Sequence, residues 1–226
     1  MTPEELRTLV GQWLAAGKTV VGPVEVKPGT VLFTPLNSPG DLLLNGWVRP
    51  ANSIKEAVFP RHEVLYGYRV EKNRIELIDQ PEPVAEQIVV GAHPCDAAAL
   101  PILDQVFNWD YREDAYNRRR ENTTVISMAC TSGDEQCFCT SVGLGPAAGR
   151  GSDAMLVERG DGAFDVHVLT EKGQKLLGGT LEACFIAKGE MTELVITEYG
   201  WTPGQMAVYS YACMHQSIDK LAESLK

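Results

Sequence analysis

Two apolar runs that each lead into cysteine residues constrain the fold of this chain more than any other feature. The run 87–90 precedes Cys95, and the run 123–128 precedes a C-x6-C-x-C group. That group consists of Cys130, Cys137 and Cys139. Short continuous apolar runs predict strands buried inside a sheet. Because two strand ends of one sheet can lie close together, the sequence predicts that the four thiols converge.

Four convergent thiols indicate an iron–sulfur cluster first and a structural zinc second. Soft sulfur ligands suit iron, and small residues allow backbone N–H groups to approach the cluster sulfides. Thr140, Ser141 and Gly143 supply such residues directly after the last thiol. The spacing C-x34-C-x6-C-x-C differs from the C-x2-C-x2-C run of ferredoxins. The residues alone therefore favour iron–sulfur and leave zinc and free thiols open.

Composition excludes several classes of partner. The chain has 226 residues and a net charge of −10, and nucleic acids and anionic membrane surfaces need a basic footprint. No apolar run approaches the roughly 20 residues that cross a bilayer, and the first residues lack the pattern of a signal peptide. We therefore expect a cytoplasmic protein with protein partners. Six cysteines in that compartment indicate metal or redox chemistry.

Hydrophobic periodicity predicts a mixed α/β (α+β) fold with a central mixed sheet, β-hairpins, flanking helices and a helix at each terminus. Helices are expected at 2–16, 96–106, 113–121, 170–177 and 206–225, with an ordered loop at 34–60. Strands are expected at 19–26, 30–33, 87–91, 123–128 and 192–197, and hairpins at 63–79 and 154–169. We expect a cluster-binding domain at 1–178 and a helical extension at 179–226 packed on it.

Several residues near the cysteines have two interpretations each. His93 either tunes or ligates a metal or, as we prefer, forms a hydrogen bond within its own turn. Asp96 is either a hydrogen-bond partner of the site or the N-cap of the following helix. The run 118–120 is Arg-Arg-Arg. It offsets cluster charge, holds a flavin or nucleotide phosphate, docks an acidic partner, or forms a solvated face paired with nearby carboxylates. Those carboxylates are Glu113, Asp114 and Glu121.

Other candidates carry weaker signals. We interpret Cys184 as buried filler, and Cys213 with His215 as core packing beside a surface histidine in preference to a metal site. The glycine-rich loop 143–149 lacks the strand and ribose-binding acid of a dinucleotide fingerprint. A wrap around the cysteine site explains its glycines better.

A series of motifs in a fixed order carries a family resemblance. The motifs are Asn52-Ser-Ile-Lys-Glu-x3-Pro60-x2-Glu63, Gly91-x2-Pro-Cys-Asp96-x2-Ala99, Asp114-x-Tyr-x-Arg-Arg119, Cys130, Cys137-Phe-Cys139, Gly145-Pro146 and Gly151-Ser-Asp153. The series, within about residues 30–178, resembles the iron–sulfur subunits of anaerobic oxidoreductase complexes. That family includes beta subunits of sulfhydrogenases, the A-type subunits of anaerobic sulfite reductases and heterodisulfide-reductase-linked proteins.

The resemblance implies that Cys95, Cys130, Cys137 and Cys139 ligate one [4Fe–4S] cluster. We place His93, Asp96 and Arg119 around it as supporting residues. Such subunits relay electrons between a flavin- or nicotinamide-linked protein and a catalytic partner. Relatives usually continue into a two-cluster ferredoxin domain, and this chain has none of its C-x2-C-x2-C motifs. The resemblance is therefore to a short form that carries a single cluster.

The resulting hypothesis is a non-catalytic electron-transfer subunit of a hydrogenase- or reductase-type complex, with a redox protein as partner. Two alternatives stay open. One is a binding or scaffold module whose cysteines hold zinc. The other is a flavin- or nucleotide-binding reductase component that uses the arginine run.

Overall fold

A six-stranded mixed sheet forms the centre of the molecule, in the order β2-β1-β5-β6-β7-β8. The computed structural model describes residues 1–47, 49–64, 66–72, 74–78 and 84–178 and the backbone of two further strands, 184–188 and 191–195. The sheet strands are β1 (Thr19–Lys27), β2 (Thr30–Pro35), β5 (Gln87–Ala92), β6 (Thr123–Met128), β7 (Ala154–Glu158) and β8 (Phe164–Val168). The predicted mixed α/β class with a central mixed sheet is confirmed.

The sheet combines a parallel centre with two antiparallel hairpins at its edges. Strands β1, β5, β6 and β7 pair in parallel, so their carboxyl ends lie at one edge of the sheet. Hairpins β1–β2 and β7–β8 supply the antiparallel outer strands. The first joins the strands expected at 19–26 and 30–33, and the second is the hairpin expected at 154–169. Strand β5 is buried almost along its whole length, as its apolar sequence requires of a central strand.

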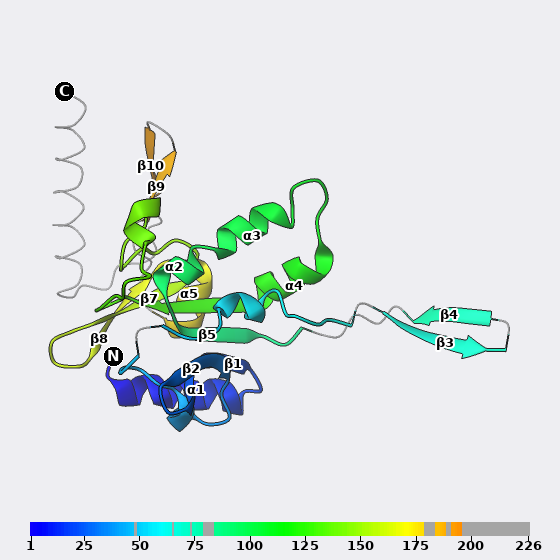
Figure 1. Cartoon of the computed structure of the whole chain (residues 1–226), viewed down its shortest axis with the longest axis horizontal. Helices are drawn as coiled ribbons and strands as arrows, with labels where there is room; N and C mark the ends of the chain where they lie inside the picture. The colour runs from blue at the N-terminus through cyan, green and yellow to red at the C-terminus, as the bar shows by residue number, and fades with distance from the viewer. Residues whose placement is uncertain are drawn as a thin grey trace.

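Helix α1 (Pro3–Ala15) covers one face of the sheet (Figure 1). A capping box begins the helix, since the Thr2 side chain accepts from the Glu5 backbone N–H and the Glu5 side chain accepts from the Thr2 N–H. Leu6, Val10 and Trp13 recur at helical spacing and are all buried. They pack with sheet residues of alternating position, which gives this face a continuous apolar core.

The opposite face is covered by η2 (Ile54–Ala57), α2 (Pro94–Ala97), α3 (Leu100–Val106) and α4 (Asp114–Asn122). One helix was expected over 96–106, and the structure has two, separated at 98–99. Pro101 at the start of α3 explains the division, because proline suits a first helical turn and interrupts a continuing one. Asp96 lies inside α2 and does not cap it, so the N-cap interpretation of Asp96 is wrong.

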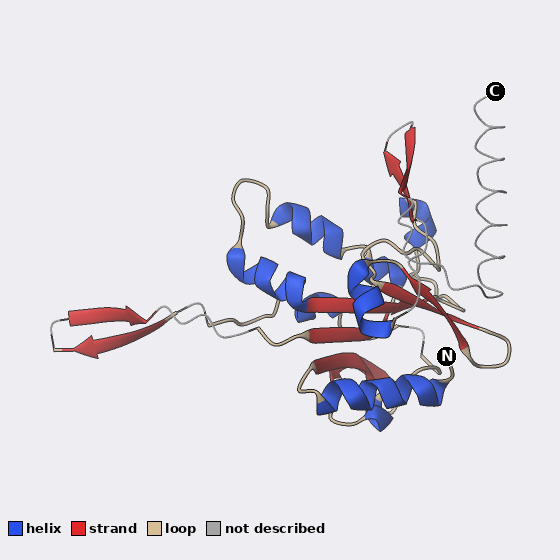
Figure 2. Ribbon diagram, turned by 180° about the vertical axis from the view of Figure 1, so that it is seen from behind, coloured by secondary structure: helices blue, strands red, loops and turns tan. Residues whose placement is uncertain are grey.

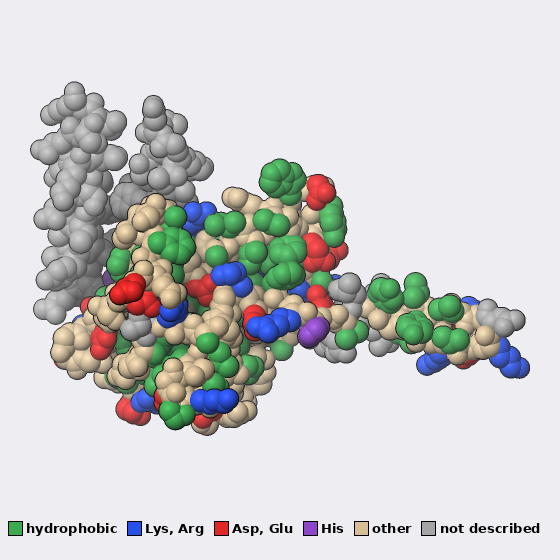
Figure 3. Space-filling view, viewed as in Figure 1, with side chains coloured by type: hydrophobic (Ala, Val, Ile, Leu, Met, Phe, Trp, Pro, Cys, Tyr) green, Lys and Arg blue, Asp and Glu red, His purple; other side chains and the backbone are tan. Residues whose placement is uncertain are grey.

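The hairpin predicted within 63–79 forms a two-stranded ribbon of β3 (Gly67–Glu71) and β4 (Arg74–Ile78). The ribbon projects away from the body of the molecule in both ribbon views (Figures 1 and 2). Nearly every residue along it is exposed, and hydrophobic side chains line the side seen in Figure 3. The sequence predicted the hairpin but not that it would project from the body of the molecule.

The remaining elements follow the predicted pattern in part. The described residues 36–47 and 49–60 form an ordered loop with the short turns η1 (Pro39–Asp41) and η2, anchored by buried Leu42 and Leu44. Helix α5 (Glu171–Leu177) ends before Gly178 as expected. Strands β9 (Cys184–Lys188) and β10 (Met191–Val195) pair antiparallel, and β9 was not predicted.

Part of the predicted C-terminal organisation lies outside the described residues. The closing helix at 206–225, Cys213 and His215 belong there. The division into 1–178 and a helical extension stays a prediction. Across the described ranges, every helix is too short or too polar to span a bilayer.

Candidate functional site

The cysteine residues gather at the carboxyl edge of the sheet. Cys95 lies in α2 directly after β5, and Cys130 follows β6. These two strands are parallel neighbours, with Val90 opposite Ile126. The carboxyl ends of β5 and β6 therefore lie side by side, as expected. None of the four cysteines forms a disulfide, and Cys95 and Cys137 are exposed while Cys130 and Cys139 are half-buried.

The thiols lie close enough to influence one another electrostatically. Burial raises the pKa of Cys130 to about 11, and the charges of Cys95, Cys139 and Cys137 add to that increase. Burial also raises the pKa of Cys95, with Asp96 and Cys139 as further causes. Mutual repulsion of this kind disfavours the ionised set unless a cation joins it. The donor chemistry thus fits a cationic metal or cluster.

The sulfur atoms are neighbours without being arranged around a common centre. Within the described ranges, no three His, Cys, Asp or Glu side chains are positioned to hold a metal ion. The thiols can raise one another's pKa without being positioned to bind one metal ion, because charges interact over longer distances than those of metal–ligand bonds.

Asp96 fixes the helix that carries Cys95. Its two carboxylate oxygens accept hydrogen bonds from the Ser53 hydroxyl at 2.6 and 2.8 Å. One of them also accepts from the Ile54 backbone N–H at 2.8 Å, and the other lies 2.5 Å from Lys55 Nζ. A charge-assisted network of this kind is stronger than neutral hydrogen bonds. The motif at 52–56 and the Pro-Cys-Asp motif are therefore in direct contact.

Asn52 extends this support to the sheet. Its side-chain oxygen accepts from the Phe33 N–H at 2.7 Å, and its amide nitrogen donates to the Phe33 carbonyl at 2.9 Å. The Asn52 amide thus pairs with β2 as another strand residue would. Strand β2, the 52–55 segment and α2 are consequently linked by side-chain hydrogen bonds.

The segment after Cys130 folds back against the same edge. The Cys130 N–H donates to the Pro146 carbonyl at 2.9 Å, and the Leu144 N–H donates to the Cys139 carbonyl at 3.0 Å. Cys139 begins the short turn η3 (Cys139–Val142), which ends in left-handed Gly143. The glycine-rich loop therefore wraps the cysteine segment, as expected.

Gly151 closes this loop onto α2. It has a φ of +80°, and a Cβ added there would lie 2.0 Å from the Ala97 carbonyl oxygen and 3.0 Å from the Pro101 ring. Only glycine permits both that backbone conformation and that approach. The loop that carries three cysteines thereby rests directly on the helix that carries the fourth.

His93 contacts Cys130 and not its own turn, contrary to the interpretation preferred above. Its Nδ1 atom lies 3.5 Å from Cys130 Sγ, and its side chain does not cap α2. Burial lowers the pKa of His93, against an opposing effect of Asp96. The imidazole ring also contacts the Trp47 ring, with 4.8 Å between centroids. A hollow lined by Trp47, His93 and Cys130, among others, opens beside this contact.

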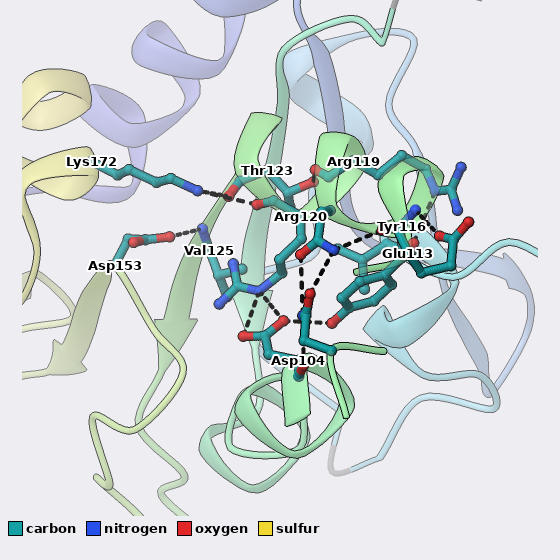
Figure 4. Close-up of polar contacts among 12 residues, drawn as sticks. Asp104, Glu113, Tyr116, Arg119, Arg120, Thr123, Val125, Asp153 and Lys172 are labelled. Carbon is teal, nitrogen blue, oxygen red and sulfur yellow. Dashed lines mark hydrogen bonds and ion pairs between the residues drawn. The ribbon is translucent and has the colours of Figure 1, made fainter. Parts of the chain in front are cut away.

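The arginine run lies on α4, where it joins helices and loops (Figure 4). Arg119 Nε donates to the Val58 carbonyl at 2.9 Å, and Arg119 forms an ion pair with Glu63. Arg120 pairs with Asp104, which also accepts from the Tyr116 hydroxyl at 2.6 Å. The solvated-face interpretation named the wrong partners for both arginines. A role for Arg119 beside a cluster stays a prediction.

Comparison with proteins of known function gives a match over most of the chain. The chain is 30% identical over 158 residues to "Sulfhydrogenase 2 subunit beta" of Pyrococcus furiosus. The match covers 70% of this chain and 44% of the relative.

This match supports the sulfhydrogenase beta-subunit-like family. It spans less than half the length of that relative. No family model and no solved structure matches the chain. The family assignment agrees with the resemblance found in the ordered motifs.

The motifs of this chain bind one another, which the sequence alone did not reveal. Asp96 binds the 53–55 segment, and Arg119 pairs with Glu63. Buried Asp153 accepts from the Val125 N–H at 2.8 Å and from the Thr170 hydroxyl at 2.6 Å. The one sign of these contacts in the sequence was that the residues involved belong to the same ordered series of motifs. Trp47, which contacts His93, lies in the segment that was expected only as an ordered loop.

Proposed function

We propose that this chain is an electron-transfer subunit of an oxidoreductase complex, and that Cys95, Cys130, Cys137 and Cys139 ligate one [4Fe–4S] cluster. The observation that carries the proposal is the meeting of two cysteine-bearing loops at the carboxyl ends of β5 and β6. The similarity to a protein named as a sulfhydrogenase subunit supports the proposal that this chain is part of an oxidoreductase complex. A bound cluster supplies one-electron oxidation and reduction.

The chain's own residues would hold and tune that group. Cys95 and Cys137 are exposed, so the site opens at the surface, where a partner's cofactor can approach. His93 lies against Cys130 on the buried side, where an N–H directed at sulfur would raise the reduction potential. The Trp47 ring packs against the His93 ring on that side and would help to hold its orientation. Proximity to a partner and control of the potential are the two tasks of a relay.

The cofactor is tested by measuring iron, acid-labile sulfide and zinc on the intact chain purified without oxygen. We expect about four irons and four sulfides per chain, the content of a cubane cluster. One zinc without sulfide would overturn the relay and support the scaffold alternative. A yellow chromophore in place of iron would support the flavin alternative.

The ligand set is tested by single substitutions. Cys137→Ser and Cys139→Ser each remove one proposed thiolate and should lose most of the iron, because metal binding is coupled to folding. Cys184→Ser leaves the four thiols intact and serves as the matched control with full iron. Equal iron in all three variants would show that the assignment is wrong.

A further inference from the structure

Arg49 joins the segment before η2 to the loop that carries Cys137. Its Nη1 atom donates a hydrogen bond to the Gln136 side-chain oxygen at 2.5 Å and lies 3.4 Å from Asp134 Oδ2. Arg49 and Gln136 are 87 positions apart in the sequence. Arg49 also precedes the ordered series of motifs, which begins at Asn52, so no sequence signal assigned it to the cysteine site.

The backbone on both sides of Arg49 is held against β2. After it, the Ala51 N–H donates to the Val31 carbonyl at 2.8 Å. Before it, the Trp47 ring contacts the edge of the Phe33 ring, with 6.1 Å between centroids. A side chain that extends from an anchored segment holds its partners in place better than one on a free loop. Arg49 is therefore the fixed end of this contact, and the cysteine loop is the supported end.

The turn that Arg49 reaches contacts the Cys137 sulfur directly. The Asp134 backbone N–H donates to Cys137 Sγ at 3.3 Å, and the Cys137 N–H donates to the Asp134 carbonyl at 3.1 Å. Asp134 Oδ1 also accepts from the Gln136 N–H at 2.9 Å, which closes the turn. Hydrogen bonds to a ligand sulfur orient it and tune the reduction potential of a cluster. Arg49 thus holds the two residues that shape the surroundings of this sulfur.

Arg49 also balances a negative charge beside that sulfur. Asp134 Oδ1 lies 3.5 Å from Cys137 Sγ, a distance at which a carboxylate and a thiolate ligand repel each other. The Arg49 guanidinium lies against the other oxygen of the same carboxylate. Its positive charge offsets the repulsion.

We infer that Arg49 is a positioning residue of the cysteine site, which holds the 134–137 turn around Cys137 and offsets the charge of Asp134. The Arg49 side chain is half-exposed, and exposed ion pairs add little to the stability of a fold. The effect of Arg49 therefore falls on the turn and on what the turn holds. Its influence on a cluster rests on the proposed function, whereas its hold on the turn does not.

Hydrogen exchange of the intact metal-free chain tests the hold on the turn. In peptides that cover 131–139, Arg49→Ala should speed exchange of the bonded N–H groups about 3-fold, the effect of losing one exposed ion pair. Arg7→Ala is the matched control, because it removes an exposed ion pair with Glu4 on α1. It should leave exchange at 131–139 unchanged. Both variants should keep the urea midpoint of the wild-type chain.

The chain purified without oxygen tests the effect on the cluster. Arg49→Ala should release iron to a chelator about 10-fold faster than the wild-type chain, as expected when a residue that orients a ligand is lost. Its reduction potential should become more negative, because a positive charge near the site is lost. Arg49→Lys keeps the charge but not the two-pronged contact, so it should recover the potential and still release iron faster. Arg7→Ala should match the wild-type chain in both measurements.

The outcomes separate this inference from the proposed function. Unchanged exchange at 131–139 in Arg49→Ala would overturn the inference whatever the chain binds. Wild-type iron release and potential in Arg49→Ala, in chains that hold a cluster, would overturn it and leave the proposed function standing. A wild-type chain without iron would overturn the proposed function and the redox effect of Arg49, while the exchange measurement would still decide whether Arg49 holds the turn.

Discussion

The face of the sheet under α1 and the cysteine edge are stabilised by different interactions. Under α1, fully buried Leu6 and Val10 pack against alternating strand residues such as Ile88 and Val90. At the cysteine edge the thiols are exposed or half-buried, and the backbone is fixed by the Asp96 network and by the approach of Gly151 to Ala97. Hydrophobic burial supplies stability without direction, whereas hydrogen bonds and close backbone approach supply position.

This difference suits the proposed function. A ligand site needs its donors at defined places and still accessible, so burial cannot be the force that places them. The α1 face can lose packing without moving a thiol, whereas the cysteine edge can lose its geometry through one substitution. The following predictions test that contrast, from the largest effect to the smallest.

Replacing Gly151 by alanine should have the largest effect. The new Cβ would overlap the Ala97 carbonyl in a left-handed backbone conformation, and no side-chain rotation relieves it. We expect a loss of more than about 4 kcal/mol in the free energy of unfolding, together with most of the bound iron. Urea unfolding and iron analysis measure the two effects.

Gly145→Ala is the matched control, since it lies in the same loop and no heavy atom lies within 4 Å of its added Cβ. It should change the free energy of unfolding by less than about 1 kcal/mol. Equal stability of the two alanine variants would contradict the close-approach argument.

Leu6→Ala should destabilise the chain through the α1 face. Leu6 is fully buried, so the substitution leaves a cavity and costs about 3 kcal/mol. Iron per folded chain should stay at the wild-type level, because Leu6 belongs to the core cluster on the other side of the sheet. Urea unfolding and iron analysis of the folded fraction measure both. Loss of iron in proportion to stability would show that the two regions are not separable.

Asp96→Ala should weaken the cysteine edge by about 2 kcal/mol, because it leaves the Ser53 hydroxyl and the Ile54 N–H without their acceptor. Asp96→Asn keeps one carbonyl oxygen and should lose about half as much. Thermal unfolding measures stability, and iron retention reports the site. Identical behaviour of the two variants would mean that the hydrogen bonds to Asp96 are not what fixes α2.

Alkaline pH should destabilise the metal-free chain slightly through Cys130. Its pKa is raised from an ordinary value of 9.0 to about 11 in the folded chain. Its contribution is fully present below pH 9 and is lost as the pH rises through 11, because the unfolded chain ionises first. Because the thiol is half-exposed, solvent screening reduces the loss to about 1 kcal/mol.

Cys130→Ser removes this titrating group and is the control for the pH dependence. Urea unfolding of both metal-free chains across that range should show the difference between them shrinking as the pH rises. A constant difference would mean that ionisation of Cys130 is not opposed in the folded state.

Much of the fold was legible in the sequence because its signals are local. The Thr2–Glu5 capping box, the stripe from Leu6 to Trp13 and the turn between β1 and β2 each depend on neighbouring residues. The apolar runs predicted β5 and β6, and with them the edge at which Cys95 and Cys130 meet. The ordered motifs also predicted the family that the comparison supports.

Only the tertiary structure decided which motifs bind one another. Asp96 was predicted equally well as a helix cap, and its partners at 53–55 are more than 40 residues away. Arg119 pairs with Glu63, which local spacing could not select over nearer carboxylates. The sequence by itself determined the strands of the central sheet, helices α1, α4 and α5 and the edge where the thiols meet, because periodic burial is a local property. The polar contacts that position this edge join distant segments, so they became defined only when the sheet brought those segments together.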